Sequence, residues 1–87
     1  PDAAKQRRYL VTGAAGFIGF HAASKLVARG DAVVGMDNFN DYYPVSLKRA
    51  RARALADQGV PVVESDINDL EALLELFQIC PFTHVLH

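Results

Sequence analysis

The sequence predicts an α/β fold in which strands and helices alternate around a parallel sheet. Apolar runs of strand character alternate with stretches of helical periodicity along the chain. A glycine-rich turn containing Gly13, Gly16 and Gly19 joins the first strand pattern to the first helix pattern, and Asp37 follows the second strand eighteen positions after Gly19. Together these features predict the N-terminal half of a Rossmann-like doubly wound parallel sheet, with the strand order 3-2-1-4.

The first βαβ unit lies on either side of the glycine-rich turn. An apolar run predicts a strand over residues 9–12, and helical periodicity predicts a helix over residues 17–29. Gly30 suits the position just after this helix, because glycine readily adopts the left-handed conformation found there. The next apolar run predicts a second strand over residues 32–36.

A second helix is predicted over residues 45–58. Pro44 can open this helix because proline is tolerated in the first helical turn, and Gly59 can close it. Apolar residues recur in it at helical spacing: Leu47, Ala50, Ala54 and Leu55.

The last part of the chain predicts a strand, a helix and a further strand. The strand over residues 61–65 is expected at an edge of the sheet, where Pro61 is tolerated. The helix is expected to begin with Asn68 as its N-cap and Glu71 three residues later, in a capping-box arrangement. Its apolar stripe consists of Leu70, Leu73, Leu74 and Phe77. A fourth strand is expected over residues 83–86.

The glycine-rich turn has the features of a dinucleotide-binding loop. Gly13 allows a tight turn out of the strand, Gly16 allows the backbone to approach a pyrophosphate, and Gly19 allows the helix to pack against the strand. The N-terminus of the helix then offers free N–H groups and the positive end of its dipole to the phosphates.

Acidic residues at the ends of two strands complete this pattern. Asp37 is expected to accept hydrogen bonds from the adenosine ribose, and its charge would repel a 2′-phosphate, so the expected cofactor is NAD rather than NADP. Asp66 could accept from the adenine amino group beside an apolar wall formed by Ile67; alternatively, Asp66 belongs only to the start of the following helix.

The second helix carries a basic run formed by Lys48, Arg49, Arg51 and Arg53. Such a run usually forms a solvated helix face. The alternative interpretation places Lys48 near the adenosine end of the cofactor.

Composition limits the other classes of function. The chain has 87 residues, a net charge of −1, one cysteine (Cys80) and no apolar run long enough to span a membrane. Neither nucleic acid nor a membrane is expected as a partner, no residue is assigned to a metal, and a cytoplasmic location is expected from the single cysteine and the lack of a signal peptide. Residues 1–7 are expected to form a flexible arm.

The motif Thr12-Gly13-Ala14-Ala15-Gly16-Phe17-Ile18-Gly19 resembles the extended short-chain dehydrogenase/reductase superfamily. The pairs Asp37-Asn38 and Asp66-Ile67 also match NAD-binding positions of that superfamily. Taken together, the residue patterns and the resemblance predict that NAD contacts the following residues: Gly13, Ala15, Gly16, Phe17, Ile18, Gly19, Asp37, Asn38, Lys48, Asp66 and Ile67.

The stretch from Asp37 to Arg51 is more specifically similar to UDP-glucuronate 4-epimerases. Its loop reads Asp-Asn-Phe-Asn-Asp-Tyr-Tyr, and Pro44 stands where that family often has Asp, which implies a local change in loop shape. The segments 19–21 and 82–87 also resemble that family. The resemblance implies interconversion of UDP-glucuronate and UDP-galacturonate through a transient 4-keto sugar. It also implies a UDP-sugar as substrate and a homodimer as the full-length assembly.

The catalytic tyrosine and lysine of this family, four residues apart, have no counterpart in the chain. Residues 1–87 are therefore expected to be the N-terminal part of an NAD-binding domain, without the catalytic segment and the sugar-nucleotide domain, and inactive as an isolated fragment. The three histidines (His21, His84 and His87) are expected to have structural roles, and Tyr42 and Tyr43 are expected to pack the loop.

Other functions remain open at the level of the sequence. Another extended family member, such as a nucleotide-sugar 4,6-dehydratase or decarboxylase, is the nearest alternative. A non-catalytic NAD-binding regulator with the same fold is a second alternative, and an α/β domain that binds no ligand is a third.

Overall fold

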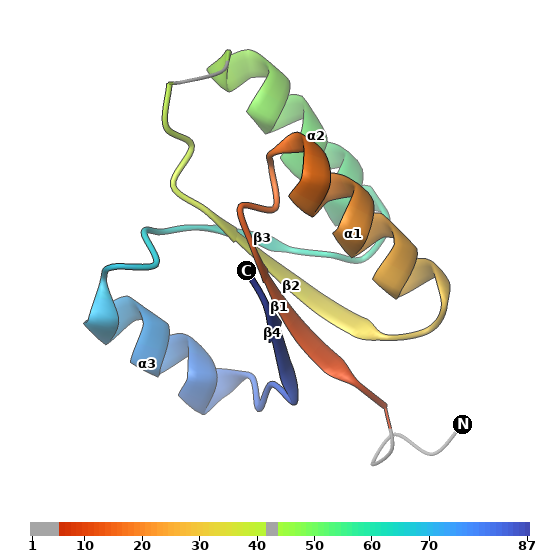
Figure 1. Cartoon of the computed structure of the whole chain (residues 1–87), viewed down its shortest axis with the longest axis vertical. Helices are drawn as coiled ribbons and strands as arrows, with labels where there is room; N and C mark the ends of the chain where they lie inside the picture. Colours follow the sequence, from red (N-terminus) through yellow and green to blue (C-terminus); the bar gives the residue numbers. More distant parts are fainter. Residues whose placement is uncertain (1–5, 42–43) are drawn as a thin grey trace.

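A computed structural model describes residues 6–41 and 44–87 of the chain. Its elements are β1 (Arg8–Thr12), α1 (Phe17–Ala28), β2 (Ala32–Asp37), α2 (Val45–Asp57), β3 (Val62–Glu64), α3 (Leu70–Ile79) and β4 (His84–Leu86). The strands form one parallel sheet in the order β3-β2-β1-β4 (Figure 1). The predicted fold class and strand order are confirmed.

The helices lie on two sides of the sheet. β2 lies beside β1, and β3 lies beside β2 on the same side. After β3 the chain crosses back through α3, and β4 pairs with the other side of β1. Right-handed crossovers therefore place α1 and α2 on one face and α3 on the other, as Figure 1 shows. The strand order reverses beside β1, which is where open α/β sheets bind ligands.

The parallel register aligns the carboxyl ends of three strands. Thr12 at the end of β1 lies opposite Met36, and Asp37 at the end of β2 lies opposite Glu64 at the end of β3. Consequently the glycine-rich turn, Asp37 and the residues after β3 all lie at the carboxyl end of the parallel strands.

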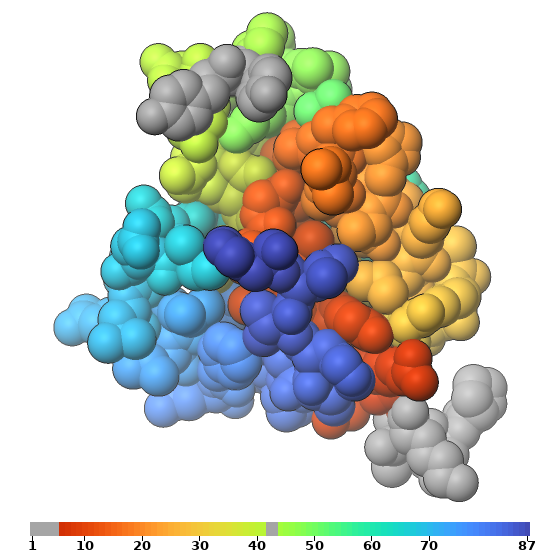
Figure 2. Space-filling model, viewed as in Figure 1, coloured from red at the N-terminus to blue at the C-terminus, as the bar shows by residue number. Residues whose placement is uncertain are grey.

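The buried core lies between the sheet and the α1–α2 layer. Its buried members are Val11, Ala14, Ala23, Val33, Leu55 and Val60. On the other face, α3 has no buried residue, and its apolar residues Leu70 and Leu74 are exposed. Figure 2 shows the C-terminal residues, in dark blue, on the surface beside α3. The apolar stripe of α3 was correctly placed on a helix, but most of it is uncovered in this chain.

The start of α3 differs from the prediction. Asp69, not Asn68, is the N-cap, and its Oδ1 accepts a hydrogen bond from the Ala72 N–H at 3.2 Å. The Asp66 carboxylate accepts the Asn68 N–H at 2.8 Å. This Asx turn holds Asn68 before the helix, so the predicted capping box of Asn68 and Glu71 is wrong by one residue.

The other boundaries agree with the predictions or differ from them by one residue. The helices α1 and α2 each end one residue early, and the following Gly30 and Gly59 have φ values of 99° and 88°. The predicted closing glycines are therefore confirmed. β3 is shorter than predicted at both ends, although the Pro61 carbonyl still accepts the Gly35 N–H at 2.8 Å.

Residues 1–5 of the expected flexible arm, together with Tyr42 and Tyr43, lie outside the described residues. Within the described part of that arm, Gln6 donates to the Gly30 carbonyl at 2.9 Å and the Arg7 carbonyl accepts the Ala32 N–H at 2.9 Å. Across residues 6–41 and 44–87, no helix has the length and apolar character needed to cross a membrane.

Candidate functional site

The glycine-rich turn is built by close backbone packing. Gly13 has a φ of 64°, a left-handed conformation that favours glycine. A Cβ placed on Gly19 would lie 2.1 Å from the Gly13 carbonyl oxygen, so only glycine lets the first turn of α1 approach the loop this closely. Gly13 makes the predicted tight turn directly after β1. Gly19 allows close packing as predicted, but against the backbone of the turn rather than against the strand.

The N-terminus of α1 is not capped by any side chain of residues 6–41 and 44–87. Gly16 is the N-cap, no side chain in the described ranges caps the helix, and its first turn holds no acidic residue. The first N–H groups of a helix have no intrahelical acceptor, and they carry the positive end of the helix dipole. This end of α1 is therefore suited to bind an anion.

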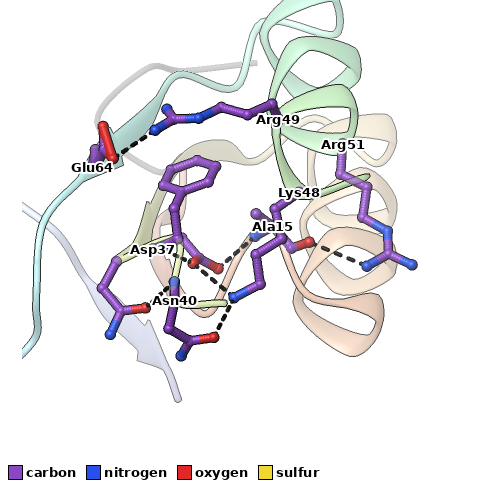
Figure 3. A network of polar contacts seen from close by, with 9 residues as sticks. Ala15, Asp37, Asn40, Lys48, Arg49, Arg51 and Glu64 are labelled. Carbon is purple, nitrogen blue, oxygen red and sulfur yellow. Dashed lines mark hydrogen bonds and ion pairs between the residues drawn. The ribbon is translucent and has the colours of Figure 1, made fainter. Parts of the chain in front are cut away.

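Asp37 links the end of β2 to the glycine-rich turn (Figure 3). One carboxylate oxygen accepts the Ala15 N–H at 3.0 Å, and the other accepts the Phe39 N–H at 2.8 Å and contacts the Lys48 Nζ at 3.4 Å. Asp37 is buried. The predicted ribose-binding residue thus also holds the loop in place, a role that sequence reasoning did not anticipate.

Lys48 is buried, unlike the rest of the basic run. Its Nζ contacts Asp37 and the Asn40 Oδ1, the latter at 3.0 Å. The interpretation of the run as a solvated face is therefore wrong for Lys48, because α2 packs this side chain against the end of β2. Arg49 and Arg53 are exposed, as that interpretation predicts.

Phe39 was missed by sequence reasoning. It is buried although its φ is 53°, a rare conformation for a bulky residue. Its N–H bonds to Asp37, and the Arg49 guanidinium carbon lies 4.1 Å from the centre of its ring. The signal in the sequence was Asp37 two residues earlier, because Asp side chains commonly bond to the N–H two positions on.

A cavity of about 410 Å³ opens at the carboxyl ends of β1, β2 and β3. Seven of the predicted cofactor-binding residues line it: Gly13, Gly16, Asp37, Asn38, Lys48, Asp66 and Ile67. The other residues that line it are Thr12, Met36, Asn40, Ser65 and His87. Asp66 thus both forms the turn before α3 and borders the cavity.

A second cavity, of about 600 Å³, lies against the first turn of α1. The predicted residues Phe17, Ile18 and Gly19 line it together with Gly13 and Gly16, and so do Leu47 and Arg51 of α2. Ala15 is fully buried and lines neither cavity; the structure brings it to Asp37 through its N–H.

His87 borders both cavities and was not predicted to do so. Its Nδ1 lies 2.7 Å from the Thr12 Oγ1. The other two histidines pack on aromatic rings: His21 beside Phe17, and His84 stacked on Tyr9. No cluster of three or more potential metal ligands occurs within residues 6–41 and 44–87.

Comparison with known proteins places this geometry in a family. Residues 10–87 match the GDP-mannose 4,6 dehydratase family. UDP-glucuronate 4-epimerases 2 and 3 of Arabidopsis thaliana are 60% and 62% identical over 78 residues, which is 90% of this chain. The chain spans only 18% of the length of each of these two relatives.

Solved structures with the same fold include two UDP-glucose 4-epimerases. The one from Stenotrophomonas maltophila, with bound NAD and formylated UDP-arabinopyranose, has a TM-score of 0.72 and 29% identity over 94% of this chain and 24% of its own. The one from Thermotoga maritima, with UDP-glucose, has a TM-score of 0.70 and 28% identity over 90% of this chain and 22% of its own.

Proposed function

We propose that this chain, which belongs to the GDP-mannose 4,6 dehydratase family, is the NAD-binding portion of a nucleotide-sugar 4-epimerase. The enzyme would interconvert UDP-glucuronate and UDP-galacturonate. This family lies within the extended short-chain dehydrogenase/reductase superfamily. The relatives with 60% and 62% identity are named UDP-glucuronate 4-epimerases, which supports this substrate. The NAD bound to the related epimerase of known structure supports the cofactor.

One observation carries the proposal. The cavity at the carboxyl ends of β1, β2 and β3 is lined by Gly13 and Gly16 of the glycine-rich turn and by Asp37 and Asp66. An anion-binding helix end beside hydrogen-bond acceptors fits a dinucleotide, which combines phosphates with ribose hydroxyls and an adenine amino group.

Different residues of the chain would bind different parts of the cofactor. Gly13, Gly16 and the N-terminus of α1 would hold the pyrophosphate. Asp66 and Ile67 would contact the adenine.

Asp37, Asn38 and Lys48 would hold the adenosine ribose. The Asp37 carboxylate accepts three protein donors, and a carboxylate offers about four acceptor positions, so one is left for a ribose hydroxyl. Lys48 has three donors, of which two are used by Asp37 and Asn40.

The cofactor, when bound, would supply a reversible hydride acceptor, and the protein would orient it and exclude water. The chain contains no tyrosine followed four residues later by lysine. The residues that move the proton of the sugar hydroxyl would therefore lie outside residues 1–87 in the full-length protein. We also propose that the full-length protein takes a UDP-sugar as substrate and forms a homodimer.

The experiment is to incubate the full-length protein with NAD and UDP-glucuronate and to separate the products. Formation of UDP-galacturonate without net reduction of NAD is expected. A decarboxylated product would instead indicate a decarboxylase. Loss of water from C6 needs a C6 hydroxyl, which UDP-glucuronate lacks, so a parallel incubation with GDP-mannose tests the dehydratase alternative, and a 6-deoxy-4-keto product there would indicate a dehydratase, in keeping with the family's description. NAD binding without any turnover would indicate a regulator, and the absence of NAD binding would overturn the proposal.

A further inference from the structure

Arg51 differs from the other basic residues of α2 in where its guanidinium lies. It is partly buried, and its Nη1 donates to the Ala15 carbonyl at 3.3 Å. Its guanidinium carbon lies 5.9 Å from the centre of the Phe17 ring, in the first turn of α1. Figure 3 shows the side chain extending from α2 to the glycine-rich turn.

Among the residues that the structure describes, no carboxylate pairs with the charge of Arg51. Lys48 pairs with Asp37 and Arg49 pairs with Glu64, but Arg51 forms no ion pair within the described ranges. A guanidinium has five donors, and the Ala15 carbonyl uses one of them. Arg51 therefore brings unused donors and a full positive charge to the edge of the second cavity.

The surroundings of this guanidinium favour an anionic partner. Gly13, Gly16 and the uncapped end of α1 line the same cavity, and no acidic residue stands in the first turn of that helix. Partial burial lowers the screening of the charge by water, which strengthens its attraction for an anion. The planar fork of arginine matches two oxygens of a phosphate group.

We propose that Arg51 is a phosphate-binding residue that contacts the diphosphate of the dinucleotide from the α2 side of the glycine-rich turn. This inference rests on the proposed function, since it concerns the same cofactor. Arg51 would add a side-chain cation to a loop that would otherwise bind phosphates through backbone N–H groups alone.

The test compares Arg51→Gln and Arg51→Lys in the full-length protein, with Arg53→Gln as the matched control on the exposed part of the same helix. Calorimetry measures the affinities for NAD and ADP, and competition against NAD measures that for adenosine. Adenosine lacks phosphate, so it reports on the rest of the site.

Loss of a charge-assisted hydrogen bond is expected to weaken NAD and ADP binding about tenfold or more in Arg51→Gln, with adenosine affinity unchanged. Arg51→Lys should keep part of the affinity for both ligands, because it retains the charge but loses the fork. Arg53→Gln should bind all three ligands as the unmodified protein does.

Unchanged NAD and ADP affinities in a folded Arg51→Gln protein would overturn the inference. An equal loss for adenosine would also overturn it, because Arg51 would then only support the loop. If Arg51→Gln does not fold, Arg51→Lys decides: weaker ADP binding with normal adenosine binding supports the inference, and unchanged ADP binding refutes it. Failure of the unmodified protein to bind NAD would refute the proposed function itself.

Discussion

The Nζ of Lys48 lies 3.4 Å from the Oδ1 of Asp37, and the two side chains are only 7% and 3% exposed. The pair connects α2 to the end of β2, and Asp37 extends the connection to the Ala15 N–H of the glycine-rich turn. A buried carboxylate needs both charge compensation and hydrogen bonds. The position of the turn therefore depends on a helix that follows it by some thirty residues.

Replacing Lys48 by methionine is expected to destabilise the protein by about 3 kcal/mol, because it leaves the buried Asp37 charge without its cation. The free energy of unfolding, measured with urea, checks this. Arg53→Met on the exposed part of the same helix is the control and should change stability by no more than about 0.5 kcal/mol. Equal effects of the two substitutions would contradict a stabilising role for the pair.

Replacing Asp37 by asparagine is expected to weaken NAD binding about tenfold, since the amide loses a charge and an acceptor position toward the loop and the ribose. NADP binding should weaken less, because the substitution removes the negative charge that disfavours a 2′-phosphate. Calorimetry with both nucleotides gives the ratio of affinities. A ratio that stays the same would show that Asp37 does not set the cofactor preference.

Gly19→Ala is expected to destabilise the protein by about 2 kcal/mol or more, because the added methyl group would meet the Gly13 backbone and force the loop to move. Alanine normally favours a helix over glycine, so the sign of the effect distinguishes a steric clash from helix propensity.

Gly13→Ala is the matched comparison for Gly19→Ala. A Cβ at Gly13 meets nothing within 4 Å, so only its φ of 64° is disfavoured, at a cost of about 1 kcal/mol. Thermal and urea unfolding of both variants measure the difference. A stabilised Gly19→Ala protein would contradict the close packing of α1 on the loop.

Asp69→Ala is expected to destabilise the first turn of α3 by about 1 kcal/mol, because its side chain caps the Ala72 N–H. Asn68→Ala should have little effect there. Hydrogen exchange at the Ala72 amide measures both, and it should accelerate only in Asp69→Ala. Faster exchange in Asn68→Ala instead would support the cap that the sequence pattern predicted.

Several features of the fold could be predicted because they depend on neighbouring residues. Apolar runs identified the strands, and apolar residues at helical spacing identified the helices. Gly30 and Gly59 marked the ends of two helices, because glycine readily adopts the left-handed conformation found there. The start of α3 was misplaced because Asn68 and Asp69 are both good caps. The competing Asp66 side chain decided between them by taking the Asn68 N–H.

The order of the elements, the glycine-rich turn and the acidic residues at the strand ends could be predicted from the sequence, because these features follow from local periodicity and conformational preference. The tertiary structure alone decided which basic residues of α2 are buried. The packing of α2 over the turn brings Lys48 to Asp37, eleven positions away, and Arg51 to Ala15, thirty-six positions away. Charge partners at such separations depend on how helices pack on the sheet, which no local pattern encodes.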